Sequence, residues 1–168
     1  MDLEKILALT KNLSVLIVED ELALRESFQF LLQNLFAEVD TAEDGQEALN
    51  KMDERDYDIV LTDLSMPRMS GLRLVDTIRT KSQSQIVVAI SAHDDEEFAE
   101  ALAPYNVKLL TKPLEMDELF ETLVPLCEQL RQSLHKISTT ADQSRNKIFW
   151  ISLSADLRVT HSCKGRFC

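Results

Sequence analysis

The sequence predicts an α/β fold in which a doubly wound, five-stranded parallel sheet is covered by helices on both faces. Short apolar runs alternate five times with segments of helical periodicity over roughly 110 residues, which is the pattern of a parallel sheet. Several of these runs, such as residues 14–18, are continuously apolar, as expected of strands buried on both faces. Right-handed crossovers would then place the carboxyl ends of all five strands at one edge of the sheet.

Each strand is predicted from its own apolar run. The run around Val39 is flanked by acidic residues, so it predicts a short strand nearer the edge of the sheet. The run that begins at Tyr57 leads directly to Asp63 and a loop rich in turn residues. The predicted strands are residues 14–18, 37–42, 57–62, 85–91 and 106–111.

The helices are predicted from apolar residues spaced three and four apart. Phe28, Leu31 and Leu35, for example, fall on one side of a helix over residues 22–36. Asp44 and Asp94 stand where they can cap two of the helices. The remaining helices are predicted within residues 2–12, after Asp44, within 72–80, after Asp94, and from about Glu115 onward.

Composition and charge narrow the class of protein. The 168 residues are 45% hydrophobic and 28% charged, as in a soluble globular protein. No apolar run approaches the ~20 residues that span a bilayer, so we expect a cytoplasmic protein without a membrane partner. The net charge of −11 falls on residues 1–113, with 22 acidic against 11 basic residues. An acidic domain repels nucleic acid and suits a divalent cation.

Polar residues at the strand ends predict a site. Glu19 and Asp20 follow the first strand, Asp63 the third, Ser91 the fourth and Lys112 the fifth. Crowded carboxylates repel one another unless a cation neutralises them, and Mg2+ prefers oxygen ligands. An ammonium and a hydroxyl can bind an oxyanion. The set therefore predicts phosphoryl transfer, with Asp63 as the nucleophile that becomes an aspartyl phosphate.

The motifs at these strand ends resemble the receiver domain of two-component response regulators (CheY-like). The resemblance covers residues 13 to about 130 and implies the flavodoxin-like strand order 2-1-3-4-5 in a (βα)5 arrangement. The matching motifs are Val18-Glu19-Asp20, the nine residues Asp63 to Gly71 (DLSMPRMSG), Ser91-Ala92 and Lys112-Pro113.

The resemblance also implies a role for each site residue. Asp63 would accept a phosphoryl group from a histidine on a sensor kinase or phosphotransfer protein. Asp20, Asp63 and the backbone carbonyl of Ser65 would ligate Mg2+, with Glu19 acting directly or through water. Lys112 and Ser91 would contact the phosphoryl oxygens, and the peptide bond after Lys112 is often cis in the family. We expect no enzymatic activity apart from phosphorylation and dephosphorylation of its own Asp63.

The resemblance also bears on switching, where the chain departs from the family, and on the lifetime of the phosphorylated state. Leu109 stands where the family has a tyrosine or phenylalanine, so a ring cannot swing toward the phosphorylated site. Ser65 and His93 lie at the positions that line the path of attacking water in the family. We expect these two residues to tune the lifetime of the phosphorylated state, and His93 can titrate near neutral pH.

The chain is predicted to divide into four parts. They are a helical lead-in (1–12), the receiver (13–124), a helical extension and linker (125–147), and a fragment of a following domain that resembles the start of a PAS sensor domain (148–168). Pro125 would cost about 3 kcal/mol inside a continuous helix, so a kink or a fresh helix start is expected there. Residues 116–137 offer apolar positions for a homodimer, and an output module is expected beyond this chain.

Two other functions remain open from the residues. One is an interaction module that has kept the fold but acts without phosphorylation, an alternative that Leu109 supports. The other is a Mg2+-dependent phosphohydrolase of the haloacid-dehalogenase type, which also uses an aspartyl nucleophile at a strand end. That family needs a second aspartate two residues after the nucleophile, where this chain has Ser65.

Overall fold

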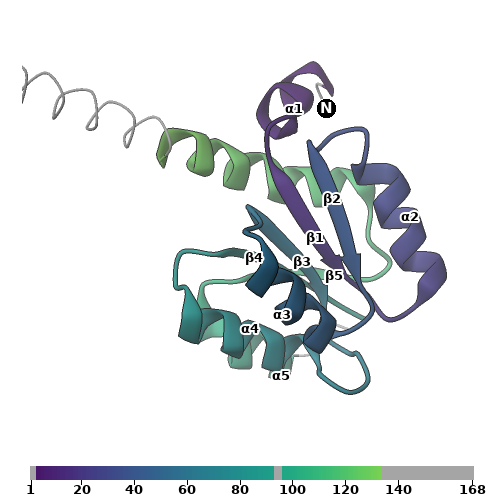
Figure 1. Ribbon diagram of the computed structural model, residues 1–168, viewed down its shortest axis with the longest axis vertical. Coiled ribbons are helices and arrows are strands. Elements are labelled where there is room, and N and C mark those ends of the chain that lie inside the picture. Colours follow the sequence, from purple (N-terminus) through teal and green to yellow (C-terminus); the bar gives the residue numbers. More distant parts are fainter. Residues whose placement is uncertain (1–2, 93–95, 134–168) are drawn as a thin grey trace, which may run out of the picture. The chain divides into compact units, whose positions relative to one another are not determined.

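A five-stranded parallel sheet forms the centre of the fold, in the order β2-β1-β3-β4-β5 (Figure 1). The computed structural model describes residues 3–92 and 96–133. Both the doubly wound α/β fold and the predicted strand order are thereby confirmed. The strands are β1 (Ser14–Val18), β2 (Glu38–Ala42), β3 (Ile59–Asp63), β4 (Ile86–Ser91) and β5 (Lys108–Thr111).

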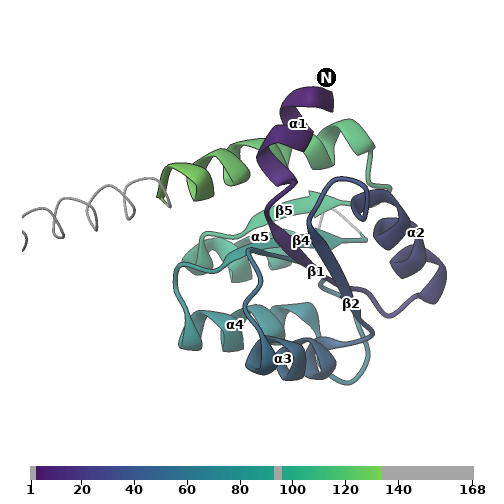
Figure 2. The same cartoon turned by 45° about the horizontal axis from the view of Figure 1, so that its top comes forward.

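Helices cover both faces of the sheet (Figures 1 and 2). α3, α4 and α5 lie together over one face, whereas α2 and the start of the last helix lie over the other. The helical elements are α1 (Leu3–Thr10), α2 (Leu22–Leu32), α3 (Gly45–Glu54), α4 (Gly71–Lys81), α5 (Glu96–Leu102), the 3₁₀ turn η1 (Ala103–Tyr105) and a helix over residues 116–133. None of these described helices is long and apolar enough to cross a membrane.

Burial of the strands follows their sequence. Every residue of β3 is buried, and four of the five in β1 are, because apolar side chains on both faces are covered by helices. In β2 only Ala42 is buried, as expected of an edge strand flanked by acidic residues. The two central strands β1 and β3 are therefore far more buried than the edge strand β2, and their carboxyl ends lead to Glu19 and Asp63.

The predicted caps are confirmed where the structure describes them. The Asp44 side chain accepts a hydrogen bond of 2.8 Å from the backbone N–H of Glu47, which satisfies a donor at the start of α3. Ser70 caps α4 in the same way, accepting from the Arg73 N–H at 3.4 Å. The predicted cap at Asp94 lies outside the described residues.

The fresh helix start expected as one possibility at Pro125 is wrong, because the helix is continuous over residues 116–133, whereas a kink there stays a prediction. Proline removes one backbone donor, but side chains on both sides of it are packed into the core. Leu123 is 2% exposed and Cys127 is fully buried. Burial of this apolar face offsets the lost hydrogen bond. Pairing of residues 116–137 between two copies stays a prediction, as do the four domain boundaries.

Candidate functional site

Strand register brings the predicted site residues together. Val18 of β1 pairs with Thr62 of β3, so the next residues, Glu19 and Asp63, are neighbours at the sheet edge. Asp63 in turn pairs with Ile90 of β4. Further across the sheet, Ser91 pairs with Thr111 of β5, which places Lys112 just past the pair. The parallel register therefore aligns residues that are far apart in the sequence.

Three carboxylates form a cluster with an open side. Oxygen atoms of Glu19, Asp20 and Asp63 all lie within 4.8 Å of one another. Glu19 and Asp63 are only 2% and 5% exposed, whereas Asp20 is exposed to solvent. A cation can therefore enter from the Asp20 side. Carboxylate oxygens at this spacing fit a hard divalent cation such as Mg2+, so the residues present suit the predicted ligand.

Lys112 bridges the two buried carboxylates. Its Nζ donates to Asp63 Oδ2 in a very short contact and to Glu19 Oε2 at 2.9 Å. Burial alone lowers the pKa of Lys112, but the hydrogen bonds and charges of Asp63 and Glu19 outweigh burial and raise it. The ammonium group therefore stays charged at neutral pH. The Lys112-Pro113 peptide bond is cis, as the resemblance implied.

Glu19 has a raised pKa. Burial is the main cause, and the hydrogen bond and charge of Lys112 oppose it. The carboxylate also accepts from the backbone N–H of Glu21 at 3.3 Å. Arg25 of α2 donates from Nη1 to the carbonyl oxygens of Glu19, at 2.6 Å, and Asp20, at 3.1 Å. Sequence reasoning missed Arg25, although its place one turn into the helix after two acidic residues was an available signal.

The backbone around Asp63 is fixed by its neighbours. The Ser65 N–H donates to Asp63 Oδ1 at 2.7 Å, so both carboxylate oxygens have a partner. The N–H of Leu64 donates to the carbonyl of Ile90 at 2.9 Å, and the N–H of Lys112 donates to the carbonyl of Ser91 at 2.7 Å. Ser91 is fully buried at the end of β4. The Asp63 carboxylate is thus surrounded by four of the predicted site residues, which are Glu19, Asp20, Ser65 and Lys112.

Comparison with known proteins identifies the family. Residues 15–124 match the response regulator receiver domain. The chain belongs to this family. The expected receiver is confirmed, whereas the match ends before residues 148–168, which lie outside the described residues, and gives no support to the expected PAS-like segment.

The curated relatives include a sensor kinase and a transcriptional regulator. The chain is 33% identical over 123 residues to the sensor histidine kinase RcsC of Salmonella typhi, covering 73% of this chain and 13% of that protein. It is 32% identical over 111 residues to the transcriptional regulatory protein YdfI of Bacillus subtilis, covering 65% of this chain and 52% of that one. The chain thus spans about half or less of the length of these two relatives.

Solved structures similar to this chain have the same fold. The response regulator TrrA of Thermotoga maritima, solved in complex with Mg2+-BeF, is 32% identical with a TM-score of 0.61, covering 67% of this chain and 97% of that one. The N-terminal domain of an uncharacterized protein from Wolinella succinogenes is 31% identical with a TM-score of 0.66, covering 72% and 98%. These likenesses extend over nearly the whole of each solved chain.

The predicted switch and tuning residues of the receiver differ in environment. Leu109 is partly buried and packs against the core with Phe98 and Tyr105. The Tyr105 hydroxyl donates to Asp76 Oδ1 at 2.7 Å, so this ring is held at the α4 side and away from Lys112. Ser65 is exposed beside Asp63, and His93 lies outside the described residues.

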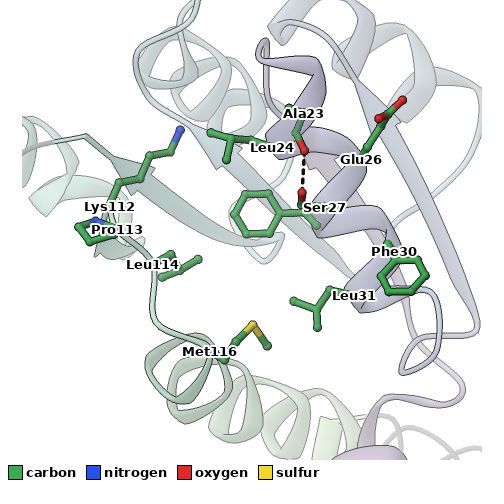
Figure 3. Close-up of a pocket in the computed structure, with 11 residues that line it drawn as sticks. Ala23, Leu24, Glu26, Ser27, Phe30, Leu31, Lys112, Pro113, Leu114 and Met116 are labelled. Atoms are coloured by element: carbon green, nitrogen blue, oxygen red, sulfur yellow. Dashed lines mark hydrogen bonds between the residues drawn. The ribbon is translucent and has the colours of Figure 1, made fainter.

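An apolar groove of about 1010 Å³ opens beside Lys112 (Figure 3). One wall comes from α2, and the other from the segment after Lys112, which includes Leu114 and Met116. Phe30 stands at the outer end of the groove with 72% of its surface exposed. Sequence reasoning missed this groove because it placed Phe30 on no particular surface. The groove is lined by Ala23, Leu24, Glu26, Ser27, Phe28, Phe30, Leu31, Lys112, Pro113, Leu114 and Met116, most of which are labelled in Figure 3.

Proposed function

We propose that this receiver accepts a phosphoryl group on Asp63 from a phosphohistidine of a histidine kinase or phosphotransfer protein. The observation that carries the proposal is the environment of the Asp63 carboxylate. It is buried, it is held between the Lys112 ammonium and the Ser65 N–H, and it lies against two further carboxylates. A similar receiver, TrrA, was solved in complex with Mg2+-BeF, which supports a cation here, and Glu19, Asp20, Asp63 and the Ser65 carbonyl would hold it.

The chemistry is the transfer of one phosphoryl group. An oxygen of Asp63 attacks phosphorus, the bond between phosphorus and the histidine nitrogen breaks, and its electron pair stays on the imidazole. Lys112 and the Ser91 hydroxyl would contact the phosphoryl oxygens and stabilise their charge. When bound, Mg2+ would supply positive charge for the same oxygens and reduce the repulsion among the carboxylates.

The apolar groove supports a protein donor over a small one. Lys112 lines both the groove and the phosphoacceptor site, so a helical surface seated against Phe30 and Met116 would have its histidine near Asp63. Exposed apolar side chains gathered at one place are typical of interaction surfaces. Phosphorylation would then alter the receiver and control a downstream module, in the manner of response regulators.

A second function is favoured by one residue. Leu109 has no ring to move toward the phosphorylated site, so a receiver that acts as an interaction module without phosphorylation stays an alternative. The two functions differ in a simple observable. The first needs an intact Asp63 for signal output, and the second does not.

Phosphorylation of Asp63 can be tested with a small donor. Incubation with Mg2+ and acetyl phosphate is expected to add the mass of one base-labile phosphoryl group to the wild type, and Asp63→Asn should abolish the adduct. Asp53→Asn is the matched control, because Asp53 is an exposed aspartate paired with Lys81 and should leave the adduct unchanged. An unmodified wild type, or an adduct that survives Asp63→Asn, would contradict the proposal.

The lifetime of the adduct should depend on Ser65 and His93. Ser65 is exposed beside Asp63, where its side chain can aid or block an attacking water. Replacing either residue with alanine is expected to change the rate of dephosphorylation by about threefold or more, through altered positioning of that water. The decay of the phosphorylated mass after removal of donor measures this rate. Equal decay in both variants and the wild type would show that neither residue tunes the lifetime.

A further inference from the structure

The loop between β3 and α4, residues 64–70, is held at both of its ends. It carries Ser65, whose carbonyl the proposed function assigns to the cation. The Gly71 N–H donates to the carbonyl of Leu64 at 3.1 Å, which joins the two ends of the loop beside β3. The second half of the loop contacts the start of α3 through Arg68 and Met69. The position of Ser65 is therefore set by two separate attachments.

Arg68 makes the second attachment. Its backbone is left-handed, with φ of 64°, which is uncommon for a residue other than glycine. Its Nε lies 2.5 Å from Asp44 Oδ2, and its Nη2 donates to Glu43 Oε1 at 2.8 Å. The next carbonyl, that of Met69, accepts from the Gly45 N–H at 3.3 Å. Side chain and backbone of the loop thus both bind the same helix terminus, which offsets the cost of the left-handed backbone.

Asp44 is shared between the helix cap and the loop. Its side chain is 6% exposed, with Oδ1 accepting from the Glu47 N–H while Oδ2 contacts Arg68. The Glu47 carboxylate accepts in return from the N–H of Glu43, the residue before the cap, at 2.9 Å, which ties the incoming chain to the first turn of α3. The Asp44 contact is buried on the carboxylate side, whereas the Glu43 pair is exposed and contributes little.

We propose that Arg68 is a positioning residue of the phosphoacceptor site, which through Asp44 fixes the loop that carries Ser65 against α3. This inference rests on the proposed function, because it concerns the same cation site. Charge and positioning predict opposite effects for Arg68. Removing its positive charge from the loop that carries Ser65 would by itself strengthen cation binding. Loosening the loop would instead weaken cation binding. Weaker binding in an Arg68 variant is therefore diagnostic of a positioning role.

The test is a calorimetric titration of the full chain with MgCl2. Arg68→Ala and Asp44→Asn are each expected to weaken Mg2+ binding by about tenfold, the lower end of what supporting residues around metal sites contribute. The double variant should bind as weakly as either single variant, since both remove one contact. Asparagine keeps the N-cap acceptor, so Asp44→Asn removes the charge pair and preserves the cap. Glu43→Gln is the matched control, with less than about a twofold change expected because its ion pair is exposed.

A second readout is independent of cation affinity. In Mg2+-free buffer, hydrogen exchange of the Ser65 amide, which donates to Asp63, should be faster in Arg68→Ala than in Glu43→Gln. If Arg68→Ala does not fold, Arg68→Lys replaces it, because lysine keeps the charge and loses the planar fork.

Three results would overturn the inference. Unchanged or tighter Mg2+ binding in Arg68→Ala, with a wild type that binds normally, would exclude the positioning role and leave the proposed function standing. Additive weakening in the double variant would show that the two residues act separately. Failure of the wild type to bind Mg2+ would contradict the cation site itself and, with it, both proposals.

Discussion

Replacing Lys112 with methionine is expected to lower the free energy of unfolding by about 3 kcal/mol at neutral pH without Mg2+. The substitution leaves the buried carboxylates of Glu19 and Asp63 without their shared cation. Methionine keeps most of the volume of lysine, so a cavity contributes little. Urea unfolding at constant ionic strength measures the loss. Adding Mg2+ should restore more stability to the variant than to the wild type, because the divalent cation then neutralises both carboxylates.

The same variant should respond to pH with a definite sign. The pKa of Glu19 is raised in the folded state by burial, so the folded protein binds this proton more readily than the unfolded chain. The destabilisation from charged Glu19 is fully present above its folded pKa and disappears as pH falls toward 4.5. In the wild type, Lys112 lowers the pKa of Glu19 and so opposes the effect of burial. Without Lys112 the pKa of Glu19 should be higher, so the variant should begin to regain stability at a higher pH as the pH falls. The contribution of Lys112 in the wild type should persist up to about pH 10.5 and decline as pH rises through its raised pKa.

Lys81→Met is the control for these measurements. Lys81 pairs with Asp53, and both side chains are more than half exposed. Loss of this pair should cost less than about 1 kcal/mol and should show no Mg2+ dependence. A Lys112→Met variant that matched this control would show that the two carboxylates need no cation in the folded protein.

Gly71→Ala is expected to destabilise the receiver by about 3 kcal/mol or more and to disturb Asp63 directly. An added Cβ would lie 1.9 Å from the Asp63 carbonyl oxygen and 2.9 Å from the Leu64 Cα, and both are backbone atoms that cannot move aside cheaply. Here the glycine is required by close approach of α4 to the end of β3. Thermal or urea unfolding measures the loss of stability. A lower yield of the phosphoryl adduct would show that the Asp63 nucleophile is displaced.

Gly45→Ala supplies a matched comparison. An added Cβ there would meet the Met69 side chain at 2.7 Å, which has to shift, and the Met69 carbonyl oxygen at 3.1 Å, which has to give by a few tenths of an ångström. Alanine is also the better helix former at the start of α3, which offsets part of the cost. We expect a loss below about 1.5 kcal/mol. Equal losses at the two positions would show that close approach to the Asp63 backbone is not the constraint at Gly71.

The sequence predicted the fold and most of the site because both depend on strand runs and their ends. The apolar runs before Glu19 and Asp63 are buried on both faces, and the parallel register of the strands then brings the two residues to the same edge of the sheet. Arg25 and Arg68 were not predicted, since their partners are backbone carbonyls and a helix cap that only the folded chain brings within reach. Pro125 was misjudged because a local rule for proline was outweighed by packing in the tertiary structure.

The hydrogen bond between Lys112 and Glu19 joins residues 93 positions apart, with Asp63 between them in the sequence. The site therefore does not exist in any partial product of translation that ends before β5. As the chain is synthesised from its amino terminus, the carboxylates of β1 and β3 are made first, and the lysine that neutralises them comes last. A nascent receiver would carry an unbalanced acidic cluster until that moment, so during this interval a dissolved cation such as Mg2+ would have to balance its charge.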